Sequence, residues 1–92
     1  MPVIFAAPAL ADLLRIRTHI GQNSPAAANR VAVQLVAACD RLEYLPERGR
    51  PSLVPGTREL VALWPYVIMY RIAREEVQIL RIWHGAQDRS GK

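Results

Sequence analysis

The chain has 92 residues, so we expect residues 1–92 to form a single domain, because a core of this size cannot be divided into two separately stable halves. Hydrophobic residues make up 51% and charged residues 22%, a balance that excludes a disordered chain. The net charge is +4, and eleven of the twelve basic residues are arginines. This bias fits a nucleic acid or acidic protein partner, although codon usage in a GC-rich genome explains it equally well.

Cys39 is the only cysteine, and it lies in a periodic apolar segment. A disulfide framework and a multi-cysteine metal site are therefore excluded, and we assign Cys39 to packing. No apolar stretch approaches the roughly 20 residues of a membrane span, and the N-terminus lacks the pattern of a signal peptide. We expect a cytoplasmic protein that uses no cofactor, no metal and no membrane.

The N-terminal part of the sequence predicts a strand followed by a helix. The β-branched and aromatic run Val3–Phe5 is typical of a strand, and Pro8 closes it. From Ala9 the apolar spacing changes to three and four, which predicts an amphipathic helix that Gly21 ends. Its apolar positions are Leu10, Leu13, Leu14, Ile16 and Ile20, and its wetter side holds Asp12, Arg15 and Arg17.

A second helix begins at Ser24 and Pro25, because a serine oxygen caps free amides and a proline is pre-set for the first helical position. Its apolar stripe consists of Ala28, Val31, Ala32, Leu35, Cys39 and Leu42. Pro46 ends the segment. The short link between the two helices requires an antiparallel hairpin.

The second half of the chain predicts a loop and three strands. Residues 46–56 contain three prolines and two glycines, so we expect no regular element there. Strand-like runs follow at residues 58–64, 66–73 and 77–84, with tight connections that favour an antiparallel meander. The predicted fold class is α+β in the order β-α-α-β-β-β, with the helical hairpin packed on one face of a small antiparallel sheet.

The last predicted strand is apolar on both of its faces. Strict alternation places Val77, Ile79, Arg81 and Trp83 on one face and Gln78, Leu80, Ile82 and His84 on the other. The helical hairpin covers only one face, so we expect a partner chain to cover the second. The polar residues 85–92 show no periodicity and are expected to form a mobile tail.

Four segments carry a family resemblance. They are residues 45–50 (LPERGR), 58–60 (REL), 66–72 (YVIMYRI) and 79–86 (ILRIWHGA). In this order, after a strand and a helical hairpin, they resemble the RelE/ParE superfamily of toxins from type II toxin–antitoxin systems. The resemblance implies a toxin that inhibits growth and that a cognate acidic antitoxin neutralises in a hetero-oligomer. The superfamily carries two functions, cleavage of messenger RNA in the ribosome and poisoning of DNA gyrase, and the fold does not choose between them.

Two positions bear on this choice. The resemblance implies that RelE-like nucleases carry an arginine directly after the tyrosine equivalent to Tyr66, and another two residues after the glycine equivalent to Gly85. This chain has Val67 and Gln87 there. Because RNA cleavage needs cations beside the phosphate charge, we favour gyrase inhibition of the ParE type, and we leave enzymatic activity open. The alternatives are a ribosome-dependent mRNA endonuclease and a non-toxic antitoxin-binding relic.

The candidate target-binding residues are Arg58, Arg71, Arg81, His84, Gln87 and Arg89. A nuclease would use His84, which exchanges a proton at cellular pH, together with Arg58, Arg81 and Tyr70. The alternative for His84 is a ring that satisfies the chain leaving the last strand. The alternative for the arginines is ion pairing, with Glu59 or Glu75 as partners of Arg71 and Arg81.

The aromatic residues also have two interpretations. Tyr66 and Tyr70 share strand parity with apolar neighbours, so they are core residues or base-stacking residues. Trp64 and Trp83 belong to the core or cover an antitoxin groove. We expect residues 81–89 to carry toxicity, and the core-facing Leu35 and Leu42 of the helical hairpin to carry folding stability.

Overall fold

The computed structural model describes residues 1–85. Its elements are β1 (Val3–Phe5), α1 (Ala7–Gly21), α2 (Pro25–Asp40), a 3-10 turn (Arg41–Glu43), β2 (Arg50–Pro51), β3 (Arg58–Leu63), β4 (Tyr66–Ala73) and β5 (Glu76–His84). The predicted α+β class and the predicted order of the main elements are confirmed. The tail predicted over residues 85–92 lies, apart from Gly85, outside the described residues.

One five-stranded sheet has the order β1-β5-β4-β3-β2. Strands β3, β4 and β5 form the predicted antiparallel meander. Strand β1, however, lies parallel to β5, with Val3 opposite Val77, so the sheet as a whole is mixed. The loop predicted to lack regular structure contributes β2, whose Arg50 lies opposite Glu59. The β1–β5 pairing joins segments at opposite ends of the chain, which local sequence patterns do not report, and β2 is only two residues long.

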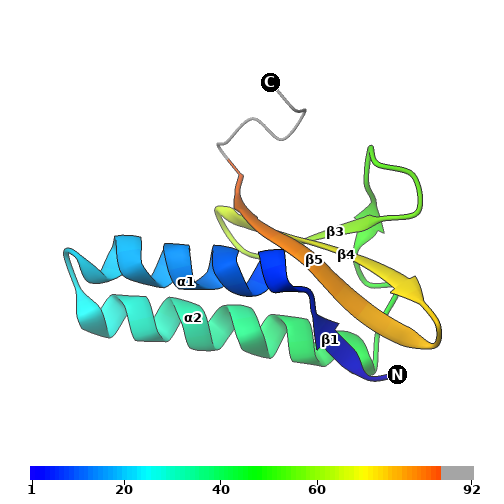
Figure 1. The fold of residues 1–92 in the computed structure, drawn as a ribbon, viewed down its shortest axis with the longest axis horizontal. Coiled ribbons are helices and arrows are strands. Elements are labelled where there is room, and N and C mark those ends of the chain that lie inside the picture. Colours follow the sequence, from blue (N-terminus) through cyan, green and yellow to red (C-terminus); the bar gives the residue numbers. More distant parts are fainter. Residues whose placement is uncertain (86–92) are drawn as a thin grey trace.

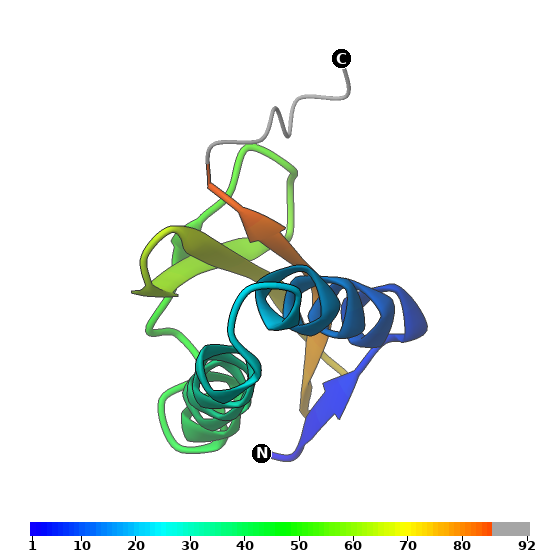
Figure 2. The same ribbon diagram turned by 90° about the vertical axis from the view of Figure 1, so that its left-hand side faces the viewer.

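The helices α1 and α2 form an antiparallel hairpin that covers one face of the sheet (Figures 1 and 2). Helix α1 lies against β5, and α2 lies against β3. The hairpin extends past the sheet, so the α1–α2 turn lies away from the strands (Figure 1). Ser24 caps α2 as predicted, because its Oγ accepts a hydrogen bond from the Ala27 N–H at 3.2 Å. Within residues 1–85, no helix is both long enough and apolar enough to cross a membrane.

The core lies between the hairpin and the sheet. Its largest fully buried side chains are Tyr70, Leu35, Leu42, Ile68, Ile79, Val77 and Cys39. Burial, with a contribution from the charge of Asp40, raises the pKa of the Cys39 thiol to about 12, so Cys39 is a packing residue as predicted. The predicted apolar stripe of α1 was too wide, because Leu10 and Leu14 are 47% and 62% exposed.

The β4–β5 connection is a two-residue turn formed by Arg74 and Glu75. Their φ angles are 56° and 59°, and Ala73 pairs with Glu76 on either side of them. Left-handed backbone at both central positions defines the hairpin turn whose twist matches that of the sheet. Glu76, which was predicted to lie in the break between strands, is the first residue of β5.

Candidate functional site at the end of β5

A β-bulge divides β5 and changes which of its residues face the helices. Two successive residues of β4 pair with Ile79 and Arg81, which leaves Leu80 as an extra residue. Strict alternation predicted Ile79 and Arg81 on one face and Ile82 on the other. The bulge reverses this phase, so that Ile82 joins Ile79 in the core with only 2% of its surface exposed.

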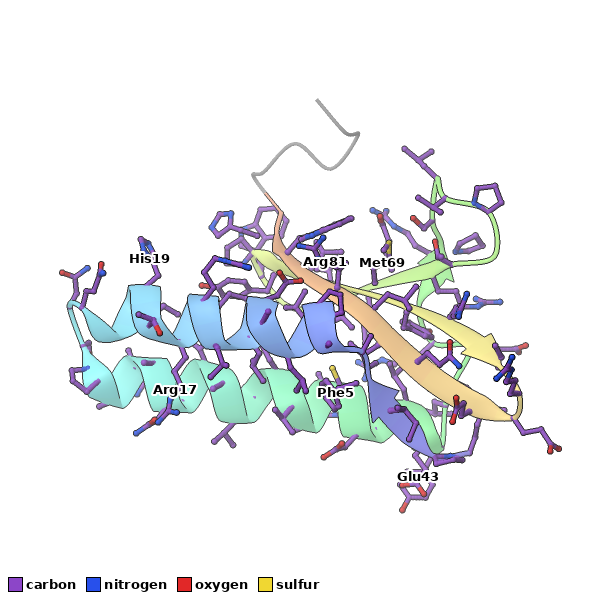
Figure 3. The ribbon with its side chains drawn as sticks, in the orientation of Figure 1. Phe5, Arg17, His19, Glu43, Met69 and Arg81 are labelled. Carbon is purple, nitrogen blue, oxygen red and sulfur yellow. The ribbon has the colours of Figure 1, made fainter. Side chains whose placement is uncertain are left out.

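The face of the sheet away from the helices is less apolar than predicted. It carries three cross-strand pairs between β4 and β5, which are Val67 with Trp83, Met69 with Arg81, and Arg71 with Gln78. Figure 3 shows Met69 and Arg81 in the same region of the sheet. The second apolar face expected from the sequence is therefore a mixed apolar and basic surface.

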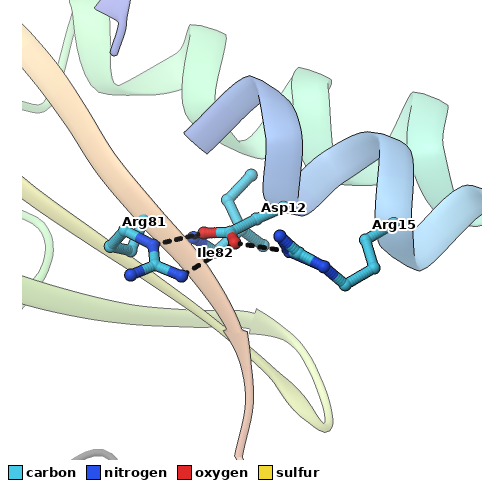
Figure 4. A network of polar contacts seen from close by, with 4 residues as sticks. All are labelled: Asp12, Arg15, Arg81 and Ile82. Atoms are coloured by element: carbon cyan, nitrogen blue, oxygen red, sulfur yellow. Dashed lines mark hydrogen bonds and ion pairs between the residues drawn. The ribbon is translucent and has the colours of Figure 1, made fainter. Parts of the chain in front are cut away.

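Asp12 of α1 is the buried charge of this site. It is 3% exposed, although the sequence placed it on the wetter side of the helix. Arg81 donates to both carboxylate oxygens, from Nε to Oδ2 at 2.7 Å and from Nη2 to Oδ1 at 2.9 Å. The backbone N–H of Ile82 donates to Oδ2 at 3.0 Å, and Arg15 donates to Oδ1 at 3.2 Å (Figure 4). Four donors thus satisfy a carboxylate that burial alone would disfavour.

The end of β1 explains why Ile82 needs a side-chain acceptor. Strand β1 pairs with β5 only as far as Ile79, whose carbonyl accepts a hydrogen bond from the Ala6 N–H at 2.9 Å. After β1 the chain continues into α1, so the edge of β5 beyond Ile79 has no neighbouring strand. A backbone N–H in a buried place needs an acceptor, and Asp12 supplies it.

Both members of the Asp12–Arg81 pair have shifted pKa values. Burial alone raises the pKa of Asp12, but the hydrogen bonds from Arg81 and Ile82 and the charges of Arg81 and Arg15 outweigh it, so the pKa lies below 3.8. The hydrogen bond to Asp12 in turn raises the pKa of Arg81. Both groups are therefore charged at neutral pH.

A sequence signal for Asp12 existed. Asp12 follows Ala9 by three residues and precedes Ile16 by four, so it belongs to the stripe of α1 that packs on the sheet. An acidic residue at such a position predicts a buried ion pair. Its partner could not be read from the spacing, because Arg81 is 69 residues away in the sequence.

Two ring contacts lie at the end of β5. The guanidinium of Arg81 is 5.3 Å from the centroid of the Trp83 ring, within the range of a cation–π interaction. The rings of Tyr66 and His84 meet edge to face, with centroids 5.6 Å apart. His84 therefore packs against β4 at the position where the chain leaves the sheet.

Gly85 ties the end of β5 to the β3–β4 turn. Its N–H donates a hydrogen bond to the Pro65 carbonyl, and a Cβ added at this position would lie 2.7 Å from the same oxygen. Trp64, which is 75% exposed, and Val67 border this contact, each 3.6 Å from such a Cβ. The close approach explains a glycine directly after His84.

The loop after α2 is held by a second group of contacts, at a different part of the sheet. The buried hydroxyl of Tyr70 donates to the Pro46 carbonyl at 2.7 Å and accepts from the Gly49 N–H at 2.8 Å. Arg58 donates from Nη1 to the Gly49 carbonyl at 2.7 Å. A Cβ at Gly49 would lie 2.7 Å from the Tyr70 ring. Burial raises the pKa of Tyr70, although the Gly49 N–H opposes this.

The candidate arginines of the sheet, Arg58, Arg71 and Arg81, lie in different places rather than in one cluster. Arg58 lies opposite Tyr70, and Arg71 is the residue after Tyr70 in β4. The side chains of Arg58 and Arg71 therefore leave the backbone on opposite faces of the sheet. Arg71 donates to Gln78 Oε1 at 2.5 Å, and Arg81 binds Asp12. Arg71 thus binds Gln78 and Arg81 binds Asp12, where the sequence had suggested Glu59 or Glu75.

The remaining candidate residues belong to several parts of the chain. Gln87 and Arg89 lie outside the described residues. Tyr66 lies opposite His84, and Tyr70 is four residues further along β4. Tyr70 and His84 are therefore about 13 Å apart along the strand. The second histidine, His19, is on the exposed surface of α1 (Figure 3). Over residues 1–85, no three side chains of the metal-binding types gather into a metal site.

A helical hairpin on one face of a meander, with a polar and aromatic end to the last strand, is the small α+β arrangement that the resemblance to RelE/ParE toxins implies. Residues 3–89 match the family model described as the ParE toxin of the type II toxin–antitoxin system parDE, and the chain belongs to this family. The resemblance to RelE/ParE toxins is confirmed, and the chain is the toxin component of a type II toxin–antitoxin system.

Three similar proteins are named as toxins or putative toxins. Toxin RelE2 of Caulobacter vibrioides is 51% identical over 86 residues, which cover 92% of this chain and 96% of that protein. Putative toxin Y4kP of Sinorhizobium fredii is 44% identical over 80 residues, which cover 86% of this chain and 82% of that protein. Toxin RelE1 of Caulobacter vibrioides is 38% identical over 90 residues, covering 95% and 96%.

Two solved structures share the fold. A chain of the chromosomal ParDE system from P. aeruginosa has a TM-score of 0.82 at 33% identity, covering 91% of this chain and 95% of that one. A chain of the RelBE2 toxin–antitoxin complex from Mycobacterium tuberculosis has a TM-score of 0.65 at 28% identity, covering 90% and 95%. Both are toxin–antitoxin systems, which supports an antitoxin partner but not one particular target.

Proposed function

We propose that this toxin inhibits growth by binding DNA gyrase in the cytoplasm, and that a cognate acidic antitoxin neutralises it in a hetero-oligomer. The observation that carries the proposal is the burial of Val67, which is 3% exposed. The RelE-like nucleases are expected to place an arginine here. A buried valine offers a phosphate no charge and would leave it poorly solvated, so this position favours protein binding over RNA cleavage.

The arrangement of the other candidate residues gives further support. Tyr70 and Arg58 are engaged by the loop backbone, and Asp12 neutralises Arg81. A nuclease needs its proton donor and its cations around one phosphate. Here Tyr70 and His84 lie about 13 Å apart along the sheet, and the nearest cation to His84 in sequence is already paired.

An exposed apolar surface supports the antitoxin partner. Leu10 and Leu14 lie one and two turns along α1 with about half or more of their surfaces exposed, and Ile4 of β1 is 47% exposed. The chain carries a net charge of +4. An acidic partner segment with its own apolar side chains would bury these leucines and neutralise part of the charge.

The alternative is a ribosome-dependent endonuclease, and His84 is the observation that favours it. His84 is half-buried at the exit of β5, a position from which a ring can protonate a leaving oxygen. A non-toxic relic that retains antitoxin binding is the third candidate. Two relatives carry the name RelE, so the nuclease is retained as an alternative to be tested.

One purified preparation tests these candidates together. Toxin separated from its antitoxin is added to a gyrase supercoiling assay and to a translation reaction in which cleavage of ribosome-bound message is mapped by primer extension. We expect loss of supercoiling and intact message. Codon-specific cuts that disappear in His84→Ala would establish the nuclease instead, and a toxin without effect in either assay or in cells would be a relic.

A further inference from the structure

We propose that Asp12 is a positioning residue for target binding, because its carboxylate sets the direction in which β5 presents its last residues. The inference rests on the proposed role of the β5 end in binding the target. Asp12 itself is buried and faces the sheet, so it acts through Arg81 and Ile82 rather than by touching the target.

One carboxylate holds both the backbone and a side chain of β5. Oδ2 accepts from the Ile82 N–H and from Nε of Arg81, and Oδ1 accepts from Nη2 of the same arginine. Two parallel bonds between a guanidinium and a carboxylate allow a single relative orientation. The residues on both sides of the peptide bond between Arg81 and Ile82 are therefore fixed by Asp12 (Figure 4).

This contact lies directly after the bulge at Leu80, where the direction of a strand is least determined by pairing. Strand β1 no longer pairs with β5 there, and on that edge the Ile82 N–H donates to Asp12 instead of to a neighbouring strand. Trp83 and His84 follow immediately, and Arg81 lies over the Trp83 ring. Asp12 thus fixes the start of the segment that is proposed to bind the target.

The same geometry separates Asp12 from the exposed side of α1. Leu10 and Leu14 are each two residues from Asp12, which turns them by roughly 160° around the helix axis. Loss of the Asp12 charge should therefore change the end of β5 and leave the exposed leucines in place. Target binding and antitoxin binding should respond differently to the same substitution.

Four variants of the full chain test the proposal: Asp12→Asn, Arg81→Gln, the double variant, and Arg15→Gln as a matched control. Asparagine keeps an oxygen for the Ile82 N–H but removes the charge and turns a donor toward Arg81. Arg15 contacts the same carboxylate from a side chain that is 66% exposed, so its replacement removes a cation without touching β5. Growth arrest at equal toxin abundance, antitoxin affinity, melting temperature and NMR signals are compared.

We expect Asp12→Asn to need at least tenfold more toxin for growth arrest, with antitoxin affinity within threefold of wild type. The Ile82 amide and Trp83 indole signals should shift, since both report on the end of β5. The double variant should be no worse than Asp12→Asn, because both changes break one contact. Arg15→Gln should match wild type in every measurement.

The proposal is wrong if Asp12→Asn arrests growth at the wild-type dose. It is also wrong if growth arrest, antitoxin affinity and melting temperature fall together, because Asp12 would then only stabilise the fold. A wild-type chain that arrests growth without inhibiting gyrase would contradict the proposed target, while the comparison of variants in cells would still decide the role of Asp12. A wild-type chain that never arrests growth would overturn both.

Discussion

The hydroxyl of Tyr70 and the backbone N–H of Gly49 are joined by a 2.8 Å hydrogen bond across 21 residues of sequence. The same hydroxyl donates to the Pro46 carbonyl, so one buried phenol closes the loop that follows α2. The loop carries the first segment of the family resemblance, and its glycine is required by the close approach of the Tyr70 ring. The resemblance at this loop thus has a structural explanation.

Tyr70→Phe should lower the free energy of unfolding by about 1–3 kcal/mol, because it leaves the buried Gly49 N–H without its acceptor. Tyr44→Phe is the matched control, since Tyr44 is 78% exposed, and it should leave stability unchanged. Urea unfolding measures both variants. Equal stabilities for the two would show that the loop does not depend on the Tyr70 hydroxyl.

Stability should fall in acid because of Asp12. In the unfolded chain this carboxyl has its usual pKa of 3.8, and in the folded protein its pKa is lower, so the unfolded state binds the proton more readily. The stabilisation is complete well above pH 3.8 and is lost as the pH falls through the folded pKa. Asp12→Asn should lose much less stability between about pH 6 and about pH 3 than wild type, measured by urea unfolding. Parallel losses in both proteins would exclude Asp12 as the cause.

The β4–β5 turn offers a stabilising change. Replacing Arg74 by Asn and Glu75 by Gly should add about 1–2 kcal/mol, because both positions have left-handed backbone that their present side chains disfavour. The melting temperature should rise by about 4–8 °C for each kcal/mol. Replacing both residues by Ala removes the same charges but keeps the backbone penalty, so it should give no comparable gain.

Antitoxin binding should depend on the exposed side of α1. Leu14→Asp should weaken antitoxin affinity by at least tenfold and leave the melting temperature nearly unchanged, because Leu14 is 62% exposed. The control is Val33→Asp on α2, where the side chain is 67% exposed. Titration calorimetry compares the two. Equal affinities for both variants would place the antitoxin on another surface.

Stability and toxicity should separate along the chain. Leu35→Ala should lower the free energy of unfolding by about 2–5 kcal/mol, because Leu35 is fully buried between the hairpin and the sheet. Deletion of residues 86–92 should abolish growth arrest and preserve antitoxin binding. A truncated chain that remains fully toxic would contradict the assignment of this segment. Arg81→Ala is a poor probe of toxicity, since it also removes the main partner of a buried carboxylate.

The sequence alone determined the main elements, their order and the family. The spacing from Ala28 to Leu42 predicted the buried stripe of α2, and Ser24 with Pro25 predicted its start. These features depend on residues a few positions apart, and their physical causes, helix periodicity and capping, are equally local. The strand runs before and after Pro65 were predictable for the same reason.

The tertiary structure decided which charges are buried and which way the last strand faces. Alternation failed at Leu80 because a bulge depends on the register of β5 against β4, which is set by packing rather than by the strand's own sequence. The role of Asp12 could not be predicted because a buried carboxylate is tolerated only where donors converge on it. Those donors, the Arg81 side chain and the Ile82 N–H, come from the opposite end of the chain, 69 and 70 residues away, and only the packing of α1 on β5 brings them together.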